Sequence, residues 1–108
     1  MNTSTSRLKK VEFSFNRYRQ KTATIYIETT QPDETVQEDQ VEIQPGLFDY
    51  VGIVSAIITH RYPADKMAAV QNNYLDDQED ADAVEEFRTM QSWRKAAKAI
   101  AKEALEQE

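Results

Sequence analysis

Cysteine is absent from this 108-residue chain, and glycine occurs only twice, as Gly46 and Gly52. The absence of cysteine excludes disulfides, thiol nucleophiles and thiolate metal sites. Two isolated glycines cannot form the glycine-rich loop that holds a nucleotide phosphate. The sequence also has no serine-nucleophile elbow and no HExxH zinc motif. These absences favour a protein with no cofactor, no metal site and no catalytic constellation.

Long apolar runs are missing as well. The opening residues, MNTSTSRLKK, lack the apolar segment of a secretory signal, and the most apolar stretch is interrupted too often to cross a bilayer. Apolar residues make up 40% of the chain and charged residues 30%, a balance typical of one soluble domain. We therefore expect a cytoplasmic protein without membrane association. Its polar, glycine-poor composition resembles that of small bacterial proteins, including those carried by prophages.

Charge is separated along the chain, although the net charge is only −6. Residues 1–21 contain six basic residues and one acidic residue, a net charge of +5. Residues 22–86 contain two basic and fifteen acidic residues, a net charge of −13, while residues 87–108 carry +2. This separation predicts either pairing of the chain ends with the middle inside one fold or steering of a charged partner. The overall acidity argues against strong non-specific binding to nucleic acid.

Three segments with alternating apolar and polar residues predict strands at residues 8–16, 22–30 and 39–44. Their connections are short, which favours an antiparallel meander with one apolar face. The first connection contains no glycine, so we expect a longer loop there, or strands that continue toward a turn at Arg19 and Gln20. Residues 1–7 are predicted to be a disordered N-terminus, and residues 8–108 a single α+β domain.

Residues 47–61 form the most apolar segment and predict a helix at the centre of the fold, packed on the sheet. Pro63 ends this helix and begins a shorter one over residues 63–74. A long C-terminal amphipathic helix is expected over residues 78–106, with the acidic run before it as its N-terminal cap. The predicted fold is therefore α+β, with a three-stranded meander followed by three helices. The inward face of the central helix is expected to contain Leu47, Tyr50, Val51, Val54, Ile57, Ile58 and Tyr62.

The third predicted helix is long for a domain of this size. About 27 residues at ~1.5 Å each span ~40 Å, whereas a globule of this chain length has a diameter of ~34 Å. We expect the helix to overhang its own domain and to meet a protein partner or a second copy of the chain. Core packing is the default for its apolar residues, and an interface is the alternative. The candidate interface residues are Met90, Trp93, Ala97 and Ile100.

The connection between the first two predicted strands is basic and contains one aromatic residue. Its candidate phosphate contacts are Arg17, Tyr18, Arg19 and Lys21. Such a tip favours contact with nucleic acid if Tyr18 stacks on a base while the cations hold the backbone. The alternative is a solvated tip that complements the acidic middle of the chain.

His60 is the only histidine. As a general base it would need a neighbouring carboxylate, such as Asp49 or Asp65. The alternative is a cation near the C-terminal end of a helix, where the dipole favours positive charge.

Seven carboxylates lie within residues 76–86, but neither reading frame of this run fits an EF-hand loop. We interpret the run as a solvated helix start, with a loose cation site or a face for a basic partner as alternatives. Without a catalytic constellation, the sequence favours a non-catalytic interaction or assembly factor. A nucleic-acid-associated protein is the alternative function, and an enzyme that uses His60 comes after it.

Overall fold

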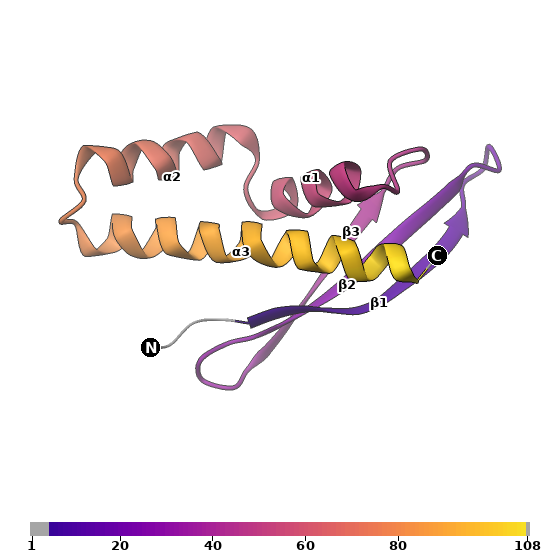
Figure 1. The fold of residues 1–108 in the computed structure, drawn as a ribbon, viewed down its shortest axis with the longest axis horizontal. Coiled ribbons are helices and arrows are strands. Elements are labelled where there is room, and N and C mark those ends of the chain that lie inside the picture. Colours follow the sequence, from indigo (N-terminus) through magenta and orange to yellow (C-terminus); the bar gives the residue numbers. More distant parts are fainter. Residues whose placement is uncertain (1–4, 108) are drawn as a thin grey trace.

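The chain forms an α+β fold in a computed structural model that describes residues 5–107 (Figure 1). A three-stranded antiparallel sheet comes first and three helices follow, the last of them long, which confirms the predicted fold class. The elements are β1 (Thr5–Phe15), β2 (Lys21–Thr30), β3 (Val36–Ile43), α1 (Tyr50–Arg61), α2 (Ala64–Asp76) and α3 (Ala81–Glu106).

The sheet is a meander in which β2 lies between β1 and β3. Its register places Val11 opposite Ile25 and Ile25 opposite Val41, so apolar residues of the three strands share one face. The pairing of β1 with β2 shifts between Leu8 and Lys10, as in a β-bulge. Because side chains alternate along a strand, the opposite face carries the polar residues. The sheet thus offers one apolar face for the helices to cover.

The loop between β1 and β2 has five residues and is organised by Asn16. The Asn16 side-chain oxygen accepts hydrogen bonds from the backbone N–H of Tyr18 (2.9 Å) and of Gln20 (3.0 Å). Arg19 has a φ of 61°, in the left-handed region. The longer loop expected from the absence of glycine is therefore present.

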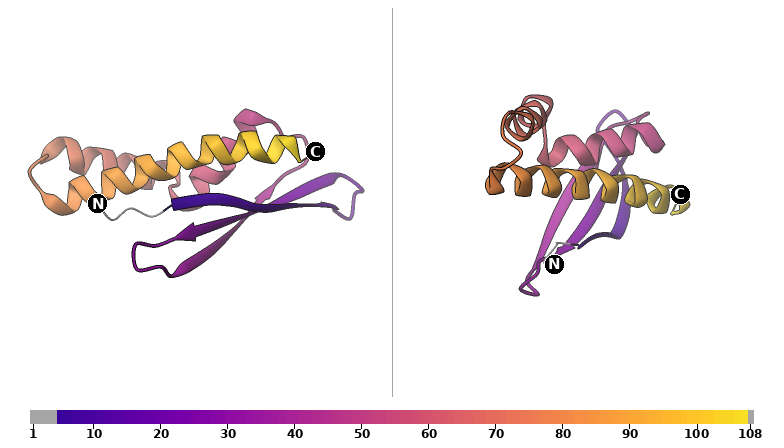
Figure 2. Two further views of the ribbon diagram at one scale, coloured as in Figure 1. Left: turned by 60° about the horizontal axis from the view of Figure 1, so that its bottom comes forward. Right: turned by 60° about the vertical axis from the view of Figure 1, so that its left-hand side comes forward.

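Helices α1 and α3 lie on one face of the sheet and leave the other face uncovered (Figure 2). Helix α3 packs along β1, and α1 packs between α3 and β3. The largest fully buried apolar side chains come from the sheet, α1 and α3, namely Ile25, Ile27, Ile43, Ile53, Ile57, Met90 and Ile100. One continuous core therefore joins the sheet to both helices.

The central position belongs to α3 rather than to α1. Seven residues of α3 are buried, whereas α1 buries only Ile53 and Ile57. Leu47 and Val51, expected on the inward face, are 50% and 75% exposed. The apolar residues of α1 surround the helix, so the sequence pattern could not distinguish the face that packs from the one that remains in water. The helix also begins later than expected, at Tyr50, because Asp49 caps it by accepting a hydrogen bond from the Gly52 N–H (2.7 Å).

The molecule is elongated, with principal extents of 51 × 30 × 20 Å. Its radius of gyration is 15.4 Å, above the ~13 Å of an average globule of this length. The cause is the pairing of α2 with the first half of α3, because this helix pair extends beyond the sheet (Figure 1). Val70, Ala83 and Met90 are buried in this region, and the rings of Tyr74 and Phe87 stack with centroids 4.1 Å apart.

Strand β1 already begins at Thr5, so residues 5–7 of the expected disordered N-terminus are paired with β2. Residues 1–4 of that prediction lie outside the described residues. No helix within residues 5–107 is both long and apolar enough to cross a membrane.

Candidate interaction surface

A polar cluster lies between the sheet and the end of α1. Asp39 is 8% exposed and accepts hydrogen bonds from Nε (2.8 Å) and Nη2 of Arg61. The same Nη2 donates to the hydroxyl of Thr29 (3.3 Å), which shares a hydrogen bond with Ser6 (2.8 Å). A buried charge is tolerated when it is paired and hydrogen-bonded in this way. The cluster therefore joins all three strands to α1.

Trp93 completes this cluster from the side of α3. The Arg61 guanidinium carbon lies 3.9 Å from the Trp93 ring centroid, and the indole N–H donates to the Ile57 carbonyl oxygen at 2.8 Å. Within residues 5–107 no buried side-chain nitrogen or oxygen lacks a hydrogen-bond partner. The buried polar groups of the cluster are therefore occupied within the fold, which indicates a structural joint rather than a reactive site.

The sequence contained a signal for this cluster that the prediction missed. Asp39 alternates in phase with the apolar Val41 and Ile43, and Thr29 alternates in phase with Ile25 and Ile27. A carboxylate at an inward strand position requires a cationic partner. Arg61 is one of only two lysine or arginine residues between positions 22 and 86, the other being Lys66.

The four candidate interface residues of the C-terminal helix are brought together, but inside the chain. Met90, Trp93, Ala97 and Ile100 are each 2% exposed or less. Trp93, Ala97 and Ile100 belong to the core cluster that contacts β2 and α1. None of the four is accessible to a partner in this conformation, so a partner would need a different surface.

His60 is exposed, and within residues 5–107 no hydrogen bond or ion pair joins it to Asp49 or Asp65. Asp49 caps the opposite end of α1, and 11 residues of helix correspond to about 16 Å. Asp65 accepts a hydrogen bond from the backbone N–H of Lys66 (3.0 Å). His60 and Arg61 form the basic last turn of α1, a position that the helix dipole favours.

Arg17, Tyr18, Arg19 and Lys21 lie together in and beside the β1–β2 loop. Tyr18 is 68% exposed, and Arg17 donates to its hydroxyl (2.8 Å) with its guanidinium carbon 5.0 Å from the ring centroid. Within the described residues, Arg17 and Arg19 form no ion pair. The loop therefore presents two cations to the solvent.

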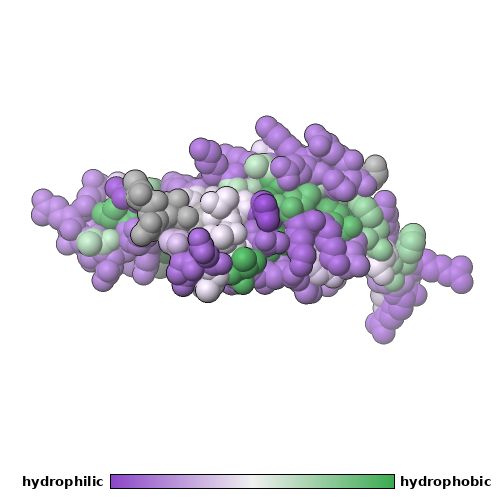
Figure 3. All heavy atoms as spheres, turned by 90° about the horizontal axis from the view of Figure 1, so that it is seen from below, coloured by the Kyte–Doolittle hydropathy of each residue, from purple (hydrophilic) through white to green (hydrophobic). Residues whose placement is uncertain are grey.

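Apolar side chains gather beside this basic loop. The inward positions of β1 continue past the covering helices, so Phe13 is 38% and Phe15 69% exposed. The segment before α1 and its first turn add further exposed apolar residues. In Figure 3, hydrophobic atoms lie just inside the hydrophilic tip at the right-hand end, where the β1–β2 loop is found. We call this region the hairpin-end surface, and it consists of the exposed residues Phe13, Phe15, Leu47, Tyr50 and Val51 and the half-buried Phe48.

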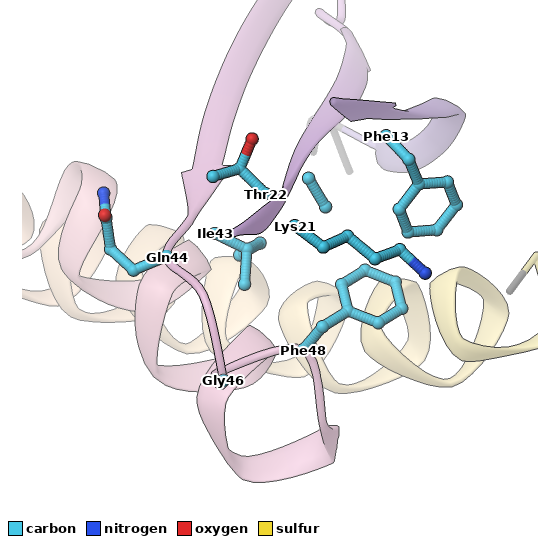
Figure 4. Close-up of a pocket in the computed structure, with 8 residues that line it drawn as sticks. Phe13, Lys21, Thr22, Ile43, Gln44, Gly46 and Phe48 are labelled. Carbon is cyan, nitrogen blue, oxygen red and sulfur yellow. The ribbon is translucent and has the colours of Figure 1, made fainter. Parts of the chain in front are cut away.

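A cavity of about 170 Å³ lies within the hairpin-end surface. The rings of Phe13 and Phe48 meet edge to face with centroids 5.2 Å apart, and the Lys21 side chain runs alongside them (Figure 4). Lys21 Nζ lies 4.4 Å from the Phe13 ring centroid. The remaining lining comes from Thr22, Ala23, Ile43, Gln44 and Gly46. Pockets for small molecules measure roughly 300–1,000 Å³, so this cavity suits one apolar side chain better than a cofactor.

The acidic run between α2 and α3 lies at the other end of the molecule (Figure 1). Asp80 caps α3 by accepting from the Asp82 N–H, and Asp77 accepts from the Glu79 N–H, each at 3.0 Å. These bonds are those expected of a helix start. Within residues 5–107, no three histidine or acidic side chains are placed to hold a metal ion.

The uncovered face of the sheet is polar and carries several ion pairs. Lys9 donates to Glu38 (2.7 Å) and Arg7 to Glu28 (3.1 Å). The hydrogen bond from Lys9 holds the pKa of the Glu38 carboxyl below its ordinary value and raises the pKa of the Lys9 ammonium. The charges of Lys9, Arg7, Glu38 and Glu28 on this face are thus paired with one another across the strands. Comparisons of this chain with protein-family models, with curated proteins and with solved structures found no match.

Proposed function

We propose that the protein is a non-catalytic interaction or assembly factor that binds a protein partner through its hairpin-end surface. The observation that carries this proposal is the exposure of Phe13 and Phe15 beside the basic loop, together with exposed Val51 in the first turn of α1, three residues after the Phe48 ring that contacts Phe13. An apolar patch bordered by charged residues is typical of a protein-binding surface. The proposal keeps the cytoplasmic location and the bacterial or prophage origin that the composition favours.

The exposed side chains are not needed to complete the core. Ile53, Ile57, Trp93 and Ile100 already close the space between sheet and helices with 2% exposure or less. Phe15 lies on the inward face of β1 but past the end of the covering helices. Burying a Phe or Val side chain is worth about 1.5–3 kcal/mol, so a partner that covers these residues gains affinity. We therefore place the protein-binding interface at the hairpin-end surface rather than on α3, where the sequence predicted it.

The test is affinity capture from the native host with a tagged chain after chemical cross-linking. A Phe15→Ser and Val51→Ser double variant is expected to lose the captured partners, because both side chains are largely exposed in the unbound fold. Val36→Ser is the matched control, since Val36 is 58% exposed but belongs to β3, outside the hairpin-end surface. Circular dichroism establishes that the double variant and the Val36→Ser control remain folded. Equal capture by wild type and the double variant would refute the proposal.

Binding to single-stranded nucleic acid is the second candidate function. It is favoured by one observation, the exposure of Tyr18 beside Arg17 and Arg19 at the tip of the loop. Aromatic stacking on bases and cationic contact with phosphates are the usual means of such binding. Arg17→Ala and Arg19→Ala are expected to weaken the retardation of a labelled single strand at low salt. No retardation by the wild-type chain would remove this candidate.

A further inference from the structure

The two ends of the long axis carry opposite charge. The β1–β2 loop with Arg17 and Arg19 is at one end of the 51 Å axis, and the α2–α3 connection is at the other (Figure 1). Residues 76–82 contain five carboxylates and no basic residue. Within the part of the chain that the structure describes, none of these five forms an ion pair. The basic charge of Arg17 and Arg19 at one end and the acidic charge of residues 76–82 at the other are therefore not neutralised by ion pairs among the described residues.

Each end also offers one half of an apolar contact. Leu75 is 67% exposed in the last turn of α2, next to Asp76. The hairpin-end surface holds the cavity lined by Phe13 and Phe48, whose volume suits one apolar side chain. An apolar anchor in a pocket, surrounded by complementary charge, is the usual arrangement of a binding hot spot.

We propose that the partner of the hairpin-end surface is the acidic end of a second copy of this chain. Leu75 of one copy enters the cavity beside Phe13 of the next, while Asp76 and Glu79 approach Arg17 and Arg19. This contact joins two different surfaces, so each bound copy still has one unoccupied end that can bind a further copy. Such a heterologous contact generates a ring or a filament rather than a closed two-fold dimer. This inference rests on the proposed interaction function and names its partner.

The first test measures the mass of the full chain by analytical ultracentrifugation. One copy has a mass of 12.5 kDa, and at about 100 µM we expect the mass to rise with concentration past that of a dimer. Leu75→Ser is expected to weaken association by about tenfold, since it removes the anchor from its pocket. Val36→Ser is the control that leaves association unchanged, because Val36 belongs to neither end. A wild-type chain that remains a monomer would overturn the proposal.

The second test uses charge reversal at each end. Arg17→Glu with Arg19→Asp makes both ends acidic, and Asp76→Lys with Glu79→Lys makes both ends basic. Aspartate is chosen at position 19 because it tolerates the left-handed backbone of Arg19 (φ 61°). Asp76 and Glu79 are chosen because the side-chain caps in this region come from Asp77 and Asp80 instead.

Each double variant alone is expected to associate at least about tenfold more weakly than wild type, because like charges then meet. An equimolar mixture of the two is expected to recover association, since every contact again joins opposite charges. Recovery also shows that both variants are folded. Failure of the mixture to recover, or a closed dimer that the variants do not change, would overturn the proposal. Capture of another protein through Phe15 by a monomeric chain would leave the proposed function intact and remove only the second copy as its partner.

Discussion

The guanidinium of Arg61 stacks on the indole ring of Trp93, with its central carbon 3.9 Å from the ring centroid. The same guanidinium donates to Asp39 on β3, so one side chain links the end of α1, the middle of α3 and the sheet. Arginine suits this position because its planar group can stack on an aromatic ring and bind a carboxylate at the same time.

Removal of the Asp39 carboxylate is expected to lower the free energy of unfolding by about 3 kcal/mol, because it leaves the Arg61 charge without its partner. Asp39→Ala is the variant, and chemical denaturation followed by Trp93 fluorescence is the measurement. Glu42→Ala on the exposed face of the same strand is the control, with an expected change within about 0.5 kcal/mol.

A double-mutant cycle with Arg61→Ala separates the ion pair from the other contacts of Arg61. Arg61→Lys is expected to recover only part of the lost stability, since an ammonium cannot make the same forked contact or stack. Additive effects of Asp39→Ala and Arg61→Ala would contradict the coupling.

Trp93→Phe is expected to destabilise the fold by about 2 kcal/mol. The change removes the donor of the 2.8 Å hydrogen bond and leaves the Ile57 carbonyl oxygen without that partner in the core. It also weakens the stacking of Arg61. Trp93 is the only tryptophan, so unfolding of this variant is followed by far-ultraviolet circular dichroism. A midpoint equal to that of wild type would refute the role of the indole N–H.

Gly52→Ala is expected to destabilise the protein, although alanine is the better helix former by about 1 kcal/mol. An added Cβ at position 52 would lie 2.1 Å from the carbonyl oxygen of Leu47 and 3.0 Å from Asp49 Oδ1. The backbone before α1 would have to move and the N-cap bond would be strained, at a cost of about 1–3 kcal/mol. The midpoint of thermal unfolding shows whether Gly52→Ala stabilises or destabilises the protein. Ser55→Ala on an exposed turn of the same helix is the matched control, for which a small gain is expected.

Lys9→Met is expected to raise the pKa of the Glu38 carboxyl toward its ordinary value of 4.5, because the hydrogen bond from Lys9 is the largest cause of the lowered value. In the wild type, the pair stabilises the fold above pH 4.5, and this contribution is lost as the pH falls through the lowered pKa. At alkaline pH the stabilising contribution of the pair is lost as the pH rises through the pKa of Lys9, which is raised above its ordinary value of 10.5.

Carbon-13 NMR of the Glu38 carboxyl across an acid titration measures this shift. Lys98→Met on the exposed side of α3 is the control and should leave the Glu38 titration in place. A Glu38 pKa that stays low in Lys9→Met would assign its cause to Gln40, whose amide also donates to that carboxyl (3.3 Å).

The sequence pattern located the strands and helices because alternation and helical spacing are local properties of the chain. It failed where burial depends on which element lies opposite. Val51 has the same apolar character as Ile57, yet it is exposed because α3 and β3 contact another side of α1. For Met90 and Trp93 the pattern made core packing the default and an interface the alternative, and the packing of α3 in the folded chain decided for burial.

The sequence alone determined four properties of this protein. They are the order of elements, the α+β class, the polar outer face of the sheet and the separation of charge along the chain. The tertiary structure decided which apolar residues remain uncovered and which charges become paired. Phe15 continues the inward alternation of Phe13 but extends past the helices that should cover it. Asp39 and Arg61 meet across 22 positions of sequence because β3 and the end of α1 are packed against the same core. The physical reason is that periodicity sets the direction of a side chain, whereas its surroundings depend on the lengths and packing of elements that are distant in sequence.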